Sequence, residues 1–509
     1  MLSCSEHAFF TAHHVYVYAI AFSRAATCLK AFQTISVETI SLKFPLKYLA
    51  MPKIVVKFGG SNLRSKEEIH RIIQVVKNYN QPLIVVVSAF YGVTNYLVEA
   101  LERARHDESV AEESAHYLFE LKKDILYHII EDKLLLTETV QLIQEQLEEL
   151  RNFLHGIALT GDASKGLEDH VLSYGERLSA IFLNGILKSQ GLESRASFPE
   201  AIGLITDGEF GNASADFHLS TNSVRESLNE DIIYIIPGFY GVSKEQKTTL
   251  FGRGGSDYAA AALARCVGAS SLDIWKDVNG FLSSDPKLVG NPVLIEKLSY
   301  NEAAELAYFG AKILHPRTVE PLIDPRIPVR IFNIYGTLDV SQPLTVISRE
   351  KSVKNGVVKS VTYSDDFGLL KLKGPGVGLK PGILAKVTTA LHHAGINISS
   401  VLTSQISINI LLAKRDLQNA YAVVSAIELS AVGRLQIEDD ISVVAAVGHG
   451  ITDNYGIAAR IFTALAADGI NVLMSCSGAS PIVSYYLVQS GDRTTAVKAI
   501  HHEFFEKQV

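Results

Sequence analysis

The pattern of hydrophobic and polar positions divides the chain into parts of different character. From Met51 to about residue 348, short runs of consecutive apolar residues alternate with longer segments in which apolar residues recur every three or four positions. Such runs are typical of strands buried on both faces of a parallel sheet, and such segments are typical of the helices that cover it. We therefore predict an α/β fold with parallel strands. The predicted strands are "KIVVKF", "PLIVVVSA", "DIIYIIPGF", "LDIWKDV" and "IPVRIFN".

Two charged segments between the second and third of these strands carry apolar residues at helical spacing. This spacing predicts two helices that form a hairpin with an exposed face. The apolar positions are Leu121, Ile125 and Ile129 in the first helix, and Val140, Ile143, Leu147 and Leu150 in the second.

The last 140 or so residues contain an internal repeat. The segment "PGILAKVTTALHHAGIN" from Pro381 matches "YGIAARIFTALAADGIN" from Tyr455 at a constant offset of 74 residues. Each copy is predicted to form a strand, a glycine-led helix, two strands, a second helix and a last strand. This βαββαβ order is typical of small α+β modules, two of which can pack side by side.

The composition mainly argues against certain classes of partner and site. The 509 residues suffice for several domains, and the net charge of −7 argues against nucleic acid as the main partner. The four cysteines, at positions 4, 28, 266 and 476, form no closely spaced pair. Neither a disulfide framework nor a zinc motif is therefore indicated, and a reducing cytoplasm is expected.

Residues 1–50 differ from the rest of the chain. Their apolar stretch "VYVYAIAF" is too short to span a bilayer, and no Lys or Arg precedes it as in a secretory signal. One interpretation is a transit segment, although Arg24 is the only arginine. We favour the other interpretation, in which translation begins at Met51 and the reading frame has been extended too far.

The stretch "TTLFGRGGSDYAAAALA" is the first candidate binding site. Gly252, Gly254 and Gly255 permit close backbone approach, and the alanine-rich segment after them is a strong helix former. Backbone N–H groups at the start of such a helix suit a phosphate. Arg253 adds a planar cation for a carboxylate or phosphate, whereas Asp257 would repel phosphate on its own. A lysine, a metal ion or both are therefore expected nearby.

A second glycine loop, "KFGGSN", follows the first predicted strand. Lys57 at the end of this strand, with Gly59, Gly60 and Ser61 behind it, fits a phosphate cradle at the carboxyl edge of a sheet. An ordinary strand-to-helix turn is the alternative, and the second glycine loop makes the cradle the better interpretation. Neither loop matches the Walker A motif, and "GRGGSD" lacks the last glycine of the dinucleotide fingerprint.

Other polar residues give weaker signals. In "SYGERLSA" the charged Glu176 and Arg177 lie early in a predicted helix, where such residues usually face solvent. "IWKDVNGFLSSDPK" predicts a strand end and a polar loop that could hold a nucleotide. "FGAKILHP" places Lys312 on a helix predicted to end before Pro316, with His315 at the helix end. The histidine pairs 392–393 and 501–502 are predicted to lie on the surface.

Taken together, these motifs resemble the aspartate kinases of the amino acid kinase family over nearly all of residues 52–509. The ordered set "KFGGSN", "VVSAFYGVTN", "SYGERLSA", "PGFYG", "TLFGRGGSDYAAA", "WKDVNGFLSSDP", "EAAELAYFGAKILHP" and "IPVRIFN" carries the resemblance, and the repeat resembles that family's paired ACT domains. The implied fold is a parallel-sheet sandwich kinase domain followed by two α+β ACT modules. The implied ranges are 1–50 for the extension, 51–348 for the kinase domain, and 360–438 and 439–509 for the ACT domains.

The resemblance implies transfer of the γ-phosphoryl group of ATP to the β-carboxylate of L-aspartate with Mg2+, the entry to lysine, threonine and methionine synthesis. No side chain is expected to ligate the metal directly. Lys57 would neutralise the transferring phosphoryl group, and Asp257 would orient the catalytic lysines. The implied substrate-binding residues are Ser88, Thr94, Glu176 and Arg253.

The resemblance also assigns nucleotide-binding positions. Lys276 stands where many members have threonine, and Leu282 replaces a frequent tyrosine, so the affinity for ATP is where this chain is expected to differ. The implied nucleotide-binding residues are Phe58, Gly59, Gly60, Ser61, Gly254, Gly255, Lys276, Asp277, Leu282, Lys287 and Lys312.

The ACT modules imply regulation by an amino acid and a homodimer or higher oligomer formed through them. Lysine is the leading effector and threonine the alternative, and a purely structural role in dimerisation is a further alternative. The implied effector-binding residues are Gly382, Ile383, Ser404 and Gln405. No nucleic acid or membrane partner is expected, and a cytoplasmic location is expected unless residues 1–50 direct the chain to a plastid.

Three other functions are alternatives to an aspartate kinase. Another amino acid kinase, acting on glutamate, acetylglutamate, carbamate or a nucleoside monophosphate, is disfavoured by the repeat and by "SYGERLSA". A fusion to homoserine dehydrogenase is disfavoured because the sequence stops at Val509. A catalytically inactive amino-acid sensor is disfavoured because the chain retains the implied catalytic and substrate-binding residues Lys57, Glu176, Arg253 and Asp257.

Overall fold

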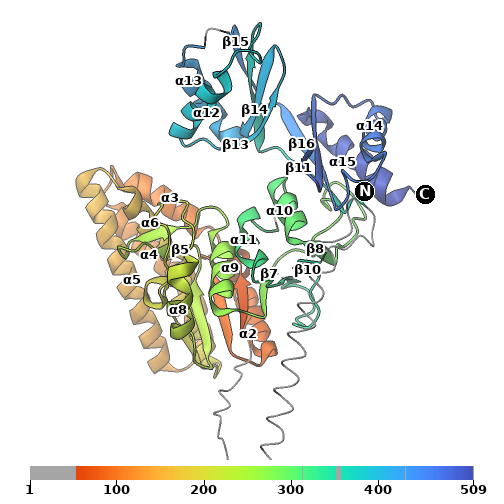
Figure 1. The fold of residues 1–509 in the computed structure, drawn as a ribbon. Coiled ribbons are helices and arrows are strands. Elements are labelled where there is room, and N and C mark those ends of the chain that lie inside the picture. Colours follow the sequence, from red (N-terminus) through yellow and green to blue (C-terminus); the bar gives the residue numbers. More distant parts are fainter. Residues whose placement is uncertain (1–52, 312, 351–356, 430, 508–509) are drawn as a thin grey trace, which may run out of the picture. The chain divides into compact units, whose positions relative to one another are not determined.

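The computed structural model of the chain describes residues 53–311, 313–350, 357–429 and 431–507 (Figure 1). The two interpretations of residues 1–50 and the prediction for Lys312 lie outside these described residues. Within the described ranges, no helix is both long enough and apolar enough to cross a membrane.

An eight-stranded sheet forms the centre of the first domain, in the order β3-β4-β2-β1-β7-β9-β10-β8. All neighbouring strands are parallel except β9 and β10, which are antiparallel. Five of the strands confirm the five predicted apolar runs. The strands are β1 (Ile54–Phe58), β2 (Leu83–Val87), β3 (Ser194–Ala196), β4 (Ile233–Pro237), β7 (Ser271–Lys276), β8 (Lys297–Ser299), β9 (Val329–Asn333) and β10 (Thr345–Ser348).

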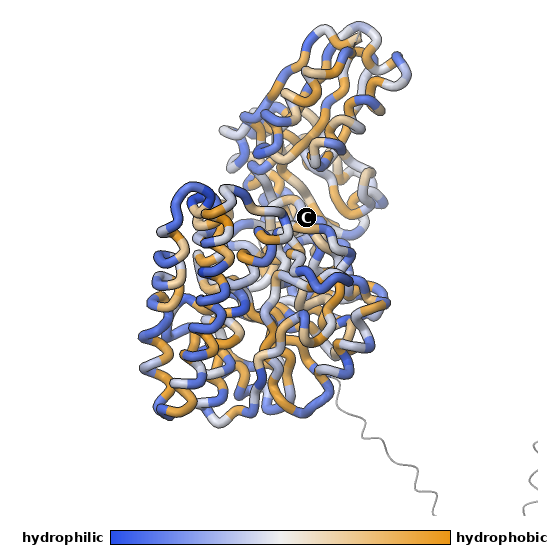
Figure 2. The backbone as a smooth tube through the Cα atoms, turned by 90° about the vertical axis from the view of Figure 1, so that its left-hand side faces the viewer, coloured by the Kyte–Doolittle hydropathy of each residue, from blue (hydrophilic) through white to orange (hydrophobic). Residues whose placement is uncertain are grey.

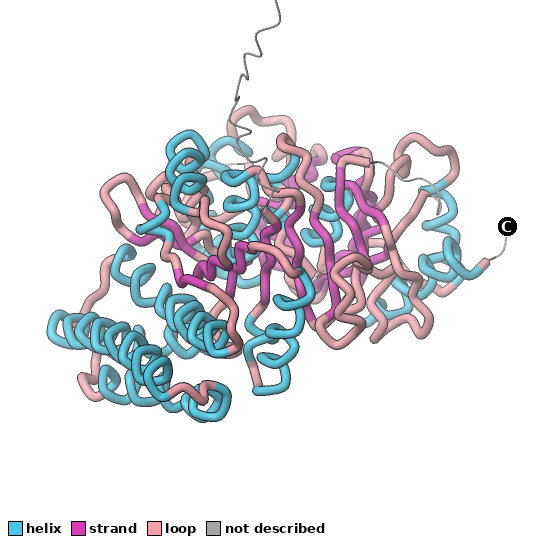
Figure 3. Tube along the Cα trace, turned by 90° about the horizontal axis from the view of Figure 1, so that it is seen from below, coloured by secondary structure: helices cyan, strands magenta, loops and turns pink. Residues whose placement is uncertain are grey.

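Helices cover both faces of this sheet (Figure 3). Successive residues of a strand point to opposite faces, so Val55 of β1 packs into the same core as the alanine-rich helix α9, and Val56 packs into the core that contains α6. A short hairpin of β5 (Tyr240–Val242) and β6 (Thr248–Leu250) precedes α9. The helices of this domain are α2 (Lys66–Tyr79), α3 (Val93–Ala104), α4 (Val110–Ile129), α5 (Lys133–Thr160), α6 (Lys165–Ser189), α7 (Pro199–Ile202), α8 (Phe217–Ser227), α9 (Gly255–Val267), α10 (Tyr300–Tyr308) and α11 (Glu320–Ile323), with 3-10 turns at η1 (Gly60–Leu63) and η2 (Pro316–Thr318).

The predicted helical hairpin is confirmed as α4 and α5. Asp132 caps α5 by accepting hydrogen bonds from the N–H groups of Leu134 and Leu135. The apolar stripes of the two helices, which include Leu126 and Leu147, pack into the core around α6. The hydrophilic positions that alternate with these stripes along the helices are visible in Figure 2.

The repeat folds into two four-stranded antiparallel sheets, each with two helices. The first contains β12 (Phe367–Lys373), α12 (Ile383–His393), β13 (Ile398–Thr403), β14 (Ser407–Ala413), α13 (Leu417–Ser425) and β15 (Arg434–Glu438). The second contains β16 (Ile441–Val447), α14 (Ile457–Ala467), β17 (Met474–Ser480), β18 (Val483–Gln489) and α15 (Arg493–His501), with a π-helical turn η5 (His502–Glu506). The first strand and first helix of the two copies keep the predicted offset of 74 residues.

The two modules are interleaved along the chain. The fourth strand of the second sheet is β11 (Ser360–Ser364), which precedes the first module and pairs antiparallel with β16 (Figure 1). The prediction of a last strand within the second copy is therefore wrong, because α15 runs on into η5 and β11 already occupies that place. The range 360–438 predicted for the first module also includes β11, whose residues belong to the second sheet.

The helix predicted to reach Pro316 is shorter than expected. It is α10, which ends at Tyr308. Gly310 has a φ angle of +119°, and a Cβ atom at this position would lie 1.8 Å from the carbonyl oxygen of Tyr363 in β11. The helix stops because the chain turns here and passes close to the second sheet, which only glycine permits.

Candidate active site

Three charged side chains meet at the carboxyl edge of the large sheet. Lys57 is the next-to-last residue of β1, Lys276 ends the neighbouring strand β7, and Asp257 lies in the first turn of α9. The Nζ atom of Lys57 lies 2.5 Å from Oδ1 of Asp257, and the Nζ atom of Lys276 lies 3.1 Å from Oδ2. Lys57 and Asp257 are both buried. A single buried carboxylate therefore orients two ammonium groups toward the same edge.

The protonation of this cluster follows from its surroundings. Burial opposes ionisation of Asp257, but the ammonium groups of Lys276 and Lys57 outweigh it and hold the pKa of Asp257 well below its usual range. Burial lowers the pKa of Lys57, and the charge of Asp257 opposes that shift. Two cations share one anion, so the cluster is suited to a further anion such as a phosphate.

The two predicted glycine loops border this cluster. A Cβ atom at Gly60 would lie 2.8 Å from the carbonyl oxygen of Ala89, and one at Gly254 would lie 2.2 Å from Cβ of His315. Gly254 also has a φ angle of +69° and caps α9, so a larger residue is excluded by both space and backbone conformation. The chain thus keeps bare backbone at two places beside the lysines, as a phosphate cradle requires.

Glu176 of α6 is a second buried carboxylate at this edge. Its Oε1 atom accepts a hydrogen bond of 3.3 Å from the hydroxyl group of Ser256. Burial raises the pKa of Glu176 to about 8, although the backbone N–H of Ala89, Ser256 and the charge of Lys57 each lower it. Glu176 is therefore largely protonated at neutral pH as long as no cationic ligand lies beside it. The interpretation of this residue as part of a solvated helix face is wrong, since it is 3% exposed.

The remaining predicted site residues lie on several segments and differ in how deeply they are buried. Ser88 follows β2 and its N–H donates to the carbonyl oxygen of Phe58, which places both beside Lys57. Thr94 lies half-buried in the first turn of α3, and Ser61 lies half-buried in η1. Arg253 is exposed next to Gly254. The predicted nucleotide-binding residues after β7 are exposed or half-buried, and they are Asp277, Leu282 and Lys287.

Leu282 and Lys287 belong to a hairpin between β7 and β8, here named the 281–295 hairpin. The N–H of Ile295 donates to the carbonyl oxygen of Phe281, and the N–H of Ser283 donates to that of Val293. Leu282 also forms a bridge with Leu294, and Lys287 lies exposed near the tip. The hairpin therefore carries two of the predicted nucleotide-binding residues on one element.

Three contributions to the cluster were missed from the sequence. The carbonyl oxygen of Ile313 accepts a hydrogen bond from Lys276 Nζ, Ser256 donates to Glu176, and His315 packs on Gly254. His315 was predicted at the end of the helix that carries Lys312, but α10 ends at Tyr308. His315 instead caps the start of the 3-10 turn η2 by accepting from the N–H of Arg317. Ser256 could have been found, because it adjoins Asp257 in the glycine motif. A carbonyl oxygen carries no signal in the sequence.

The predicted effector-binding residues lie in the first ACT module. Gly382 caps α12 with a φ angle of +88°, and Ile383 packs in the core of that module. Ser404 and Gln405 are exposed in the turn after β13, where the carbonyl oxygen of Gln405 accepts from the N–H of Gly378. The segment before α12, which contains Gly378, therefore adjoins the turn that contains Ser404 and Gln405.

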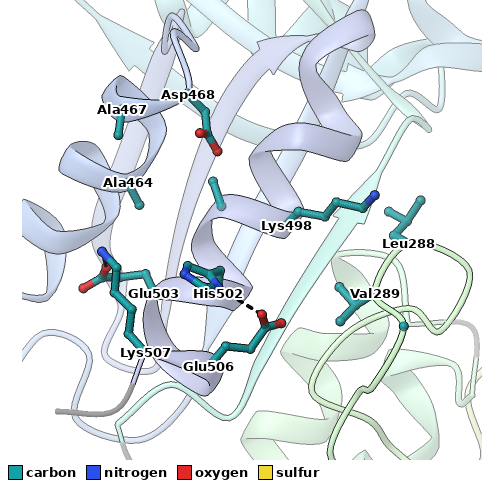
Figure 4. A pocket seen from close by; sticks show the side chains of 12 residues that line it. Leu288, Val289, Ala464, Ala467, Asp468, Lys498, His502, Glu503, Glu506 and Lys507 are labelled. Atoms are coloured by element: carbon teal, nitrogen blue, oxygen red, sulfur yellow. Dashed lines mark hydrogen bonds and ion pairs between the residues drawn. The ribbon is translucent and has the colours of Figure 1, made fainter.

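A cavity of about 410 Å³ lies elsewhere, beside the second ACT module (Figure 4). It is bordered by Leu288, Val289 and Gly290 of the 281–295 hairpin and by residues of α14, α15 and η5. Among the described residues, no group of three or more His, Cys, Asp and Glu side chains could hold a metal ion. The cavity lies at the contact between this hairpin and the module, and neither Lys57 nor Lys276 lines it.

The edge cluster and the two repeats define a kinase-like α/β domain followed by regulatory modules, and comparison with known proteins agrees. The profile of the amino acid kinase family matches residues 52–333, and two ACT domain profiles match residues 362–426 and 444–504. Aspartokinase 1, chloroplastic, of Arabidopsis thaliana is 30% identical over 467 residues, which cover 89% of this chain and 80% of that protein.

Longer relatives and solved structures match as well. A bifunctional aspartokinase/homoserine dehydrogenase of Haemophilus influenzae is 30% identical over 89% of this chain, which spans only 57% of that protein. The structure of E. coli aspartokinase III in complex with aspartate and ADP (R-state) is 28% identical with a TM-score of 0.76, covering 89% of this chain and all of that one. Its complex with lysine and aspartate (T-state) has a TM-score of 0.71, at 28% identity over 89% of this chain and 99% of that one. The chain belongs to the amino acid kinase family and, within it, to the aspartokinases.

Proposed function

We propose that this chain transfers the γ-phosphoryl group of ATP to the β-carboxylate of L-aspartate, giving 4-phospho-L-aspartate and ADP. The observation that carries the proposal is the buried cluster of Lys57, Asp257 and Lys276, which holds one more cation than anion beside two bare glycine loops. The E. coli relative was solved with aspartate and ADP bound. In pathway terms, the reaction is the entry to lysine, threonine and methionine synthesis.

The chemistry needs positioning and charge stabilisation. A β-carboxylate oxygen of aspartate attacks the γ-phosphorus, the bond to the oxygen that bridges the β- and γ-phosphates breaks, and that oxygen leaves with its electron pair on ADP. Lys57 and Lys276 stabilise the negative charge spread over the transferring group, and Asp257 fixes both ammonium groups. The attacking carboxylate is already ionised at neutral pH, so no general base is required.

Aspartate would be held by groups around the edge of the cluster. We assign its ammonium group to Glu176, because a cation beside that buried carboxyl group would favour the ionised form. We assign its α-carboxylate to Arg253, with Ser88 and Thr94 on the loop and helix that close over it. Arg253 is exposed, as expected of a side chain that closes only on its ligand.

The phosphates of ATP are placed at the glycine loops, because the N–H groups at the start of a helix suit a phosphate. A Cβ at Gly60 or Gly254 would clash with Ala89 or His315 and so displace these loops. We place the nucleotide against the segments around Phe58–Ser61, Gly254–Gly255, Lys276–Asp277 and the 281–295 hairpin. Mg2+ would arrive bound to the ATP phosphates and neutralise part of their charge. No protein ligand is assigned to it.

Regulation is proposed to act through the ACT modules. Lysine is the leading effector, because the T-state structure of the E. coli relative contains it, and threonine is the alternative. Gly382, Ile383, Ser404 and Gln405 mark the proposed effector site. We further propose a homodimer formed through these modules and a cytoplasmic location. The proposed domain ranges are 51–348, 360–438 and 439–509, with β11 of the second range contributed to the sheet of the third. A plastid is the alternative, since the Arabidopsis relative is described as chloroplastic.

The test measures ADP release by the purified chain with Mg2+ and ATP. Each of L-aspartate, L-glutamate and no acceptor is assayed with and without lysine, threonine or both. We expect release only with aspartate and suppression by one amino acid, which would name the effector. Release independent of aspartate would point to another acceptor. No release would favour an inactive amino-acid sensor.

A further inference from the structure

The 281–295 hairpin is bonded to the second ACT module as well as to the kinase domain. The N–H of Val361 in β11 donates to the carbonyl oxygen of Ser283 at 2.8 Å, and the hydroxyl group of Ser284 donates to the carbonyl oxygen of Val361 at 3.0 Å. The hydroxyl group of Ser360 donates to the carbonyl oxygen of Leu282 at 2.9 Å. One backbone and two side-chain hydrogen bonds therefore hold the hairpin against β11, the edge strand of the second sheet.

A buried histidine adds a side-chain link to this backbone pairing. His501 at the end of α15 is 1% exposed, and its Nε2 atom lies 2.9 Å from the hydroxyl oxygen of Ser283, which is fully buried. Its Nδ1 atom lies 3.1 Å from Oε1 of Glu506. The prediction that both histidines of the pair lie on the surface is therefore wrong for His501 and confirmed for His502, whose side chain is 57% exposed.

For a neutral His501 ring, counting donors and acceptors gives the direction of these hydrogen bonds. The carboxylate of Glu506 can only accept, so Nδ1 of His501 carries the proton. The hydroxyl oxygen of Ser283 already accepts from the N–H of Val293 at 2.8 Å, and its own hydrogen is free to reach Nε2 of a neutral ring. A continuous chain of hydrogen bonds then runs from Val293 through Ser283 and His501 to Glu506.

We propose that His501 is a positioning residue for the nucleotide: through Ser283 it holds the 281–295 hairpin in the conformation that contacts ATP. This inference rests on the proposed function, since that proposal places Leu282 and Lys287 at the nucleotide. The second ACT module then supplies part of the support of the ATP site, in addition to any regulatory role.

The repeat shows that the ACT fold itself does not demand this residue. Helix α13 of the first module and helix α15 of the second occupy the same place in their modules, and each ends after nine residues. The last residue of α13 is Ser425, which is exposed, whereas the last residue of α15 is the buried His501. The buried histidine is therefore found at the end of α15, the helix end that contacts the 281–295 hairpin, and not at the end of α13.

The next residue offers a matched control. His502 also bonds Glu506, at 2.9 Å from Nδ1 to Oε2, but it faces the cavity described above, into which Leu288 and Val289 of the hairpin project from the other side (Figure 4). Replacing His502 removes a neighbouring imidazole and a bond to the same carboxylate without touching Ser283.

The experiment compares His501→Leu, His501→Gln and His502→Leu in the full chain. Steady-state kinetics give KM for ATP, KM for aspartate and kcat, calorimetry gives the dissociation constant for ADP, and thermal unfolding checks the fold.

We expect His501→Leu to raise KM for ATP and the ADP dissociation constant about tenfold, because the buried hydroxyl group of Ser283 loses its partner. KM for aspartate should stay within about twofold. His501→Gln, whose amide oxygen can accept from Ser283, should restore most of the loss. His502→Leu should change little.

A double variant isolates the pair. Ser283→Ala with His501→Leu should weaken nucleotide binding less than the product of the two single effects. Multiplicative effects, an unchanged KM for ATP in a folded His501→Leu chain, or an equal rise in both KM values would overturn the inference. An unmodified chain without aspartate-dependent turnover would instead refute the proposed function, and unchanged ADP affinity in His501→Leu would then still overturn the inference on its own.

Discussion

Two buried charge clusters in this chain look alike in composition but differ in balance. At the sheet edge, Lys57 and Lys276 share Asp257, and the nearby Glu176 is largely protonated at neutral pH because its pKa is raised to about 8. Where α10 meets the second ACT module, Glu302 is fully buried and pairs with Lys359 at 2.9 Å. The first cluster carries a net positive charge and the second is neutral.

The surroundings of the second cluster confirm its balance. The N–H of Ser299 donates to Oε2 of Glu302 at 2.9 Å, and the N–H of His449 donates to Oε1 at 3.1 Å. Lys359 also donates to the carbonyl oxygen of Lys297 at 3.2 Å. A buried ion pair whose polar atoms all have hydrogen-bond partners is typical of a structural contact. An excess of buried charge of one sign is typical of a site that binds a ligand. Charge balance therefore separates a binding site from a fold-stabilising contact.

The largest expected effect is on catalysis at the unbalanced cluster. Asp257→Asn keeps the shape of the side chain but removes the charge that orients Lys57 and Lys276. We expect kcat to fall about a thousandfold, the scale of losing a preorganised electrostatic group. Steady-state kinetics with saturating ATP and aspartate check this. A variant with near-normal turnover would remove the proposed role of Asp257.

The next effect is on stability at the balanced cluster. Glu302→Ala leaves Lys359 buried without its partner, and we expect the free energy of unfolding to fall by about 3–5 kcal/mol. Denaturant unfolding measures this change. In the double variant Glu302→Leu with Lys359→Met the charges leave together, so most of the loss should be absent. Equal losses in the single and double variants would contradict the ion-pair argument.

A pH dependence distinguishes Glu176 from a balanced charge. Its folded pKa of about 8 exceeds the ordinary value of 4.5, so the folded state holds a proton that the unfolded state has released between these values. Stability of the ligand-free chain therefore falls as the pH rises from about 4.5 to 8. We expect Glu176→Gln to melt a few degrees higher than the unmodified chain at pH 8, and at a similar temperature at pH 4.5. A difference that does not change with pH would exclude the raised pKa.

The smallest effect comes from a half-exposed ion pair in the first ACT module. Lys371 of β12 pairs with Glu438 of β15, and their side chains are 22% and 27% exposed. Solvent screens such a pair, so Glu438→Ala should cost at most about 1 kcal/mol. The same denaturant unfolding serves as the measurement. A cost equal to that of Glu302→Ala would show that burial does not set the difference between the pairs.

Much of the fold could be predicted from the sequence because its signals are local. The five apolar runs became β1, β2, β4, β7 and β9, and the glycine-led helices of the repeat kept their offset. The origin of the fourth strand in the second sheet could not be predicted, because pairing between β11 and β16 joins segments about 80 residues apart and leaves no periodic pattern.

The candidate site was predictable only in part. Lys57 and Asp257 stand in glycine-rich motifs, and the structure brings them together. The position of His501 was predicted wrongly, since its burial depends on the kinase hairpin that packs against it and not on its own helix. The pKa of Glu176 depends on burial by several elements, so no single segment indicates it. Local sequence patterns therefore indicate the motifs, whereas the burial and protonation of the site residues depend on segments that are distant in the sequence.

The interleaved order of the ACT strands also has a mechanical consequence. The first module is an insertion between β11 and β16 of the second sheet, joined by the short links 365–366 and 439–440. Since β11 and β16 are hydrogen-bonded neighbours, the two links leave the sheet side by side. The first module is therefore covalently continuous at one end with β11, the strand that holds the 281–295 hairpin, and at the other end with the strand that pairs with β11.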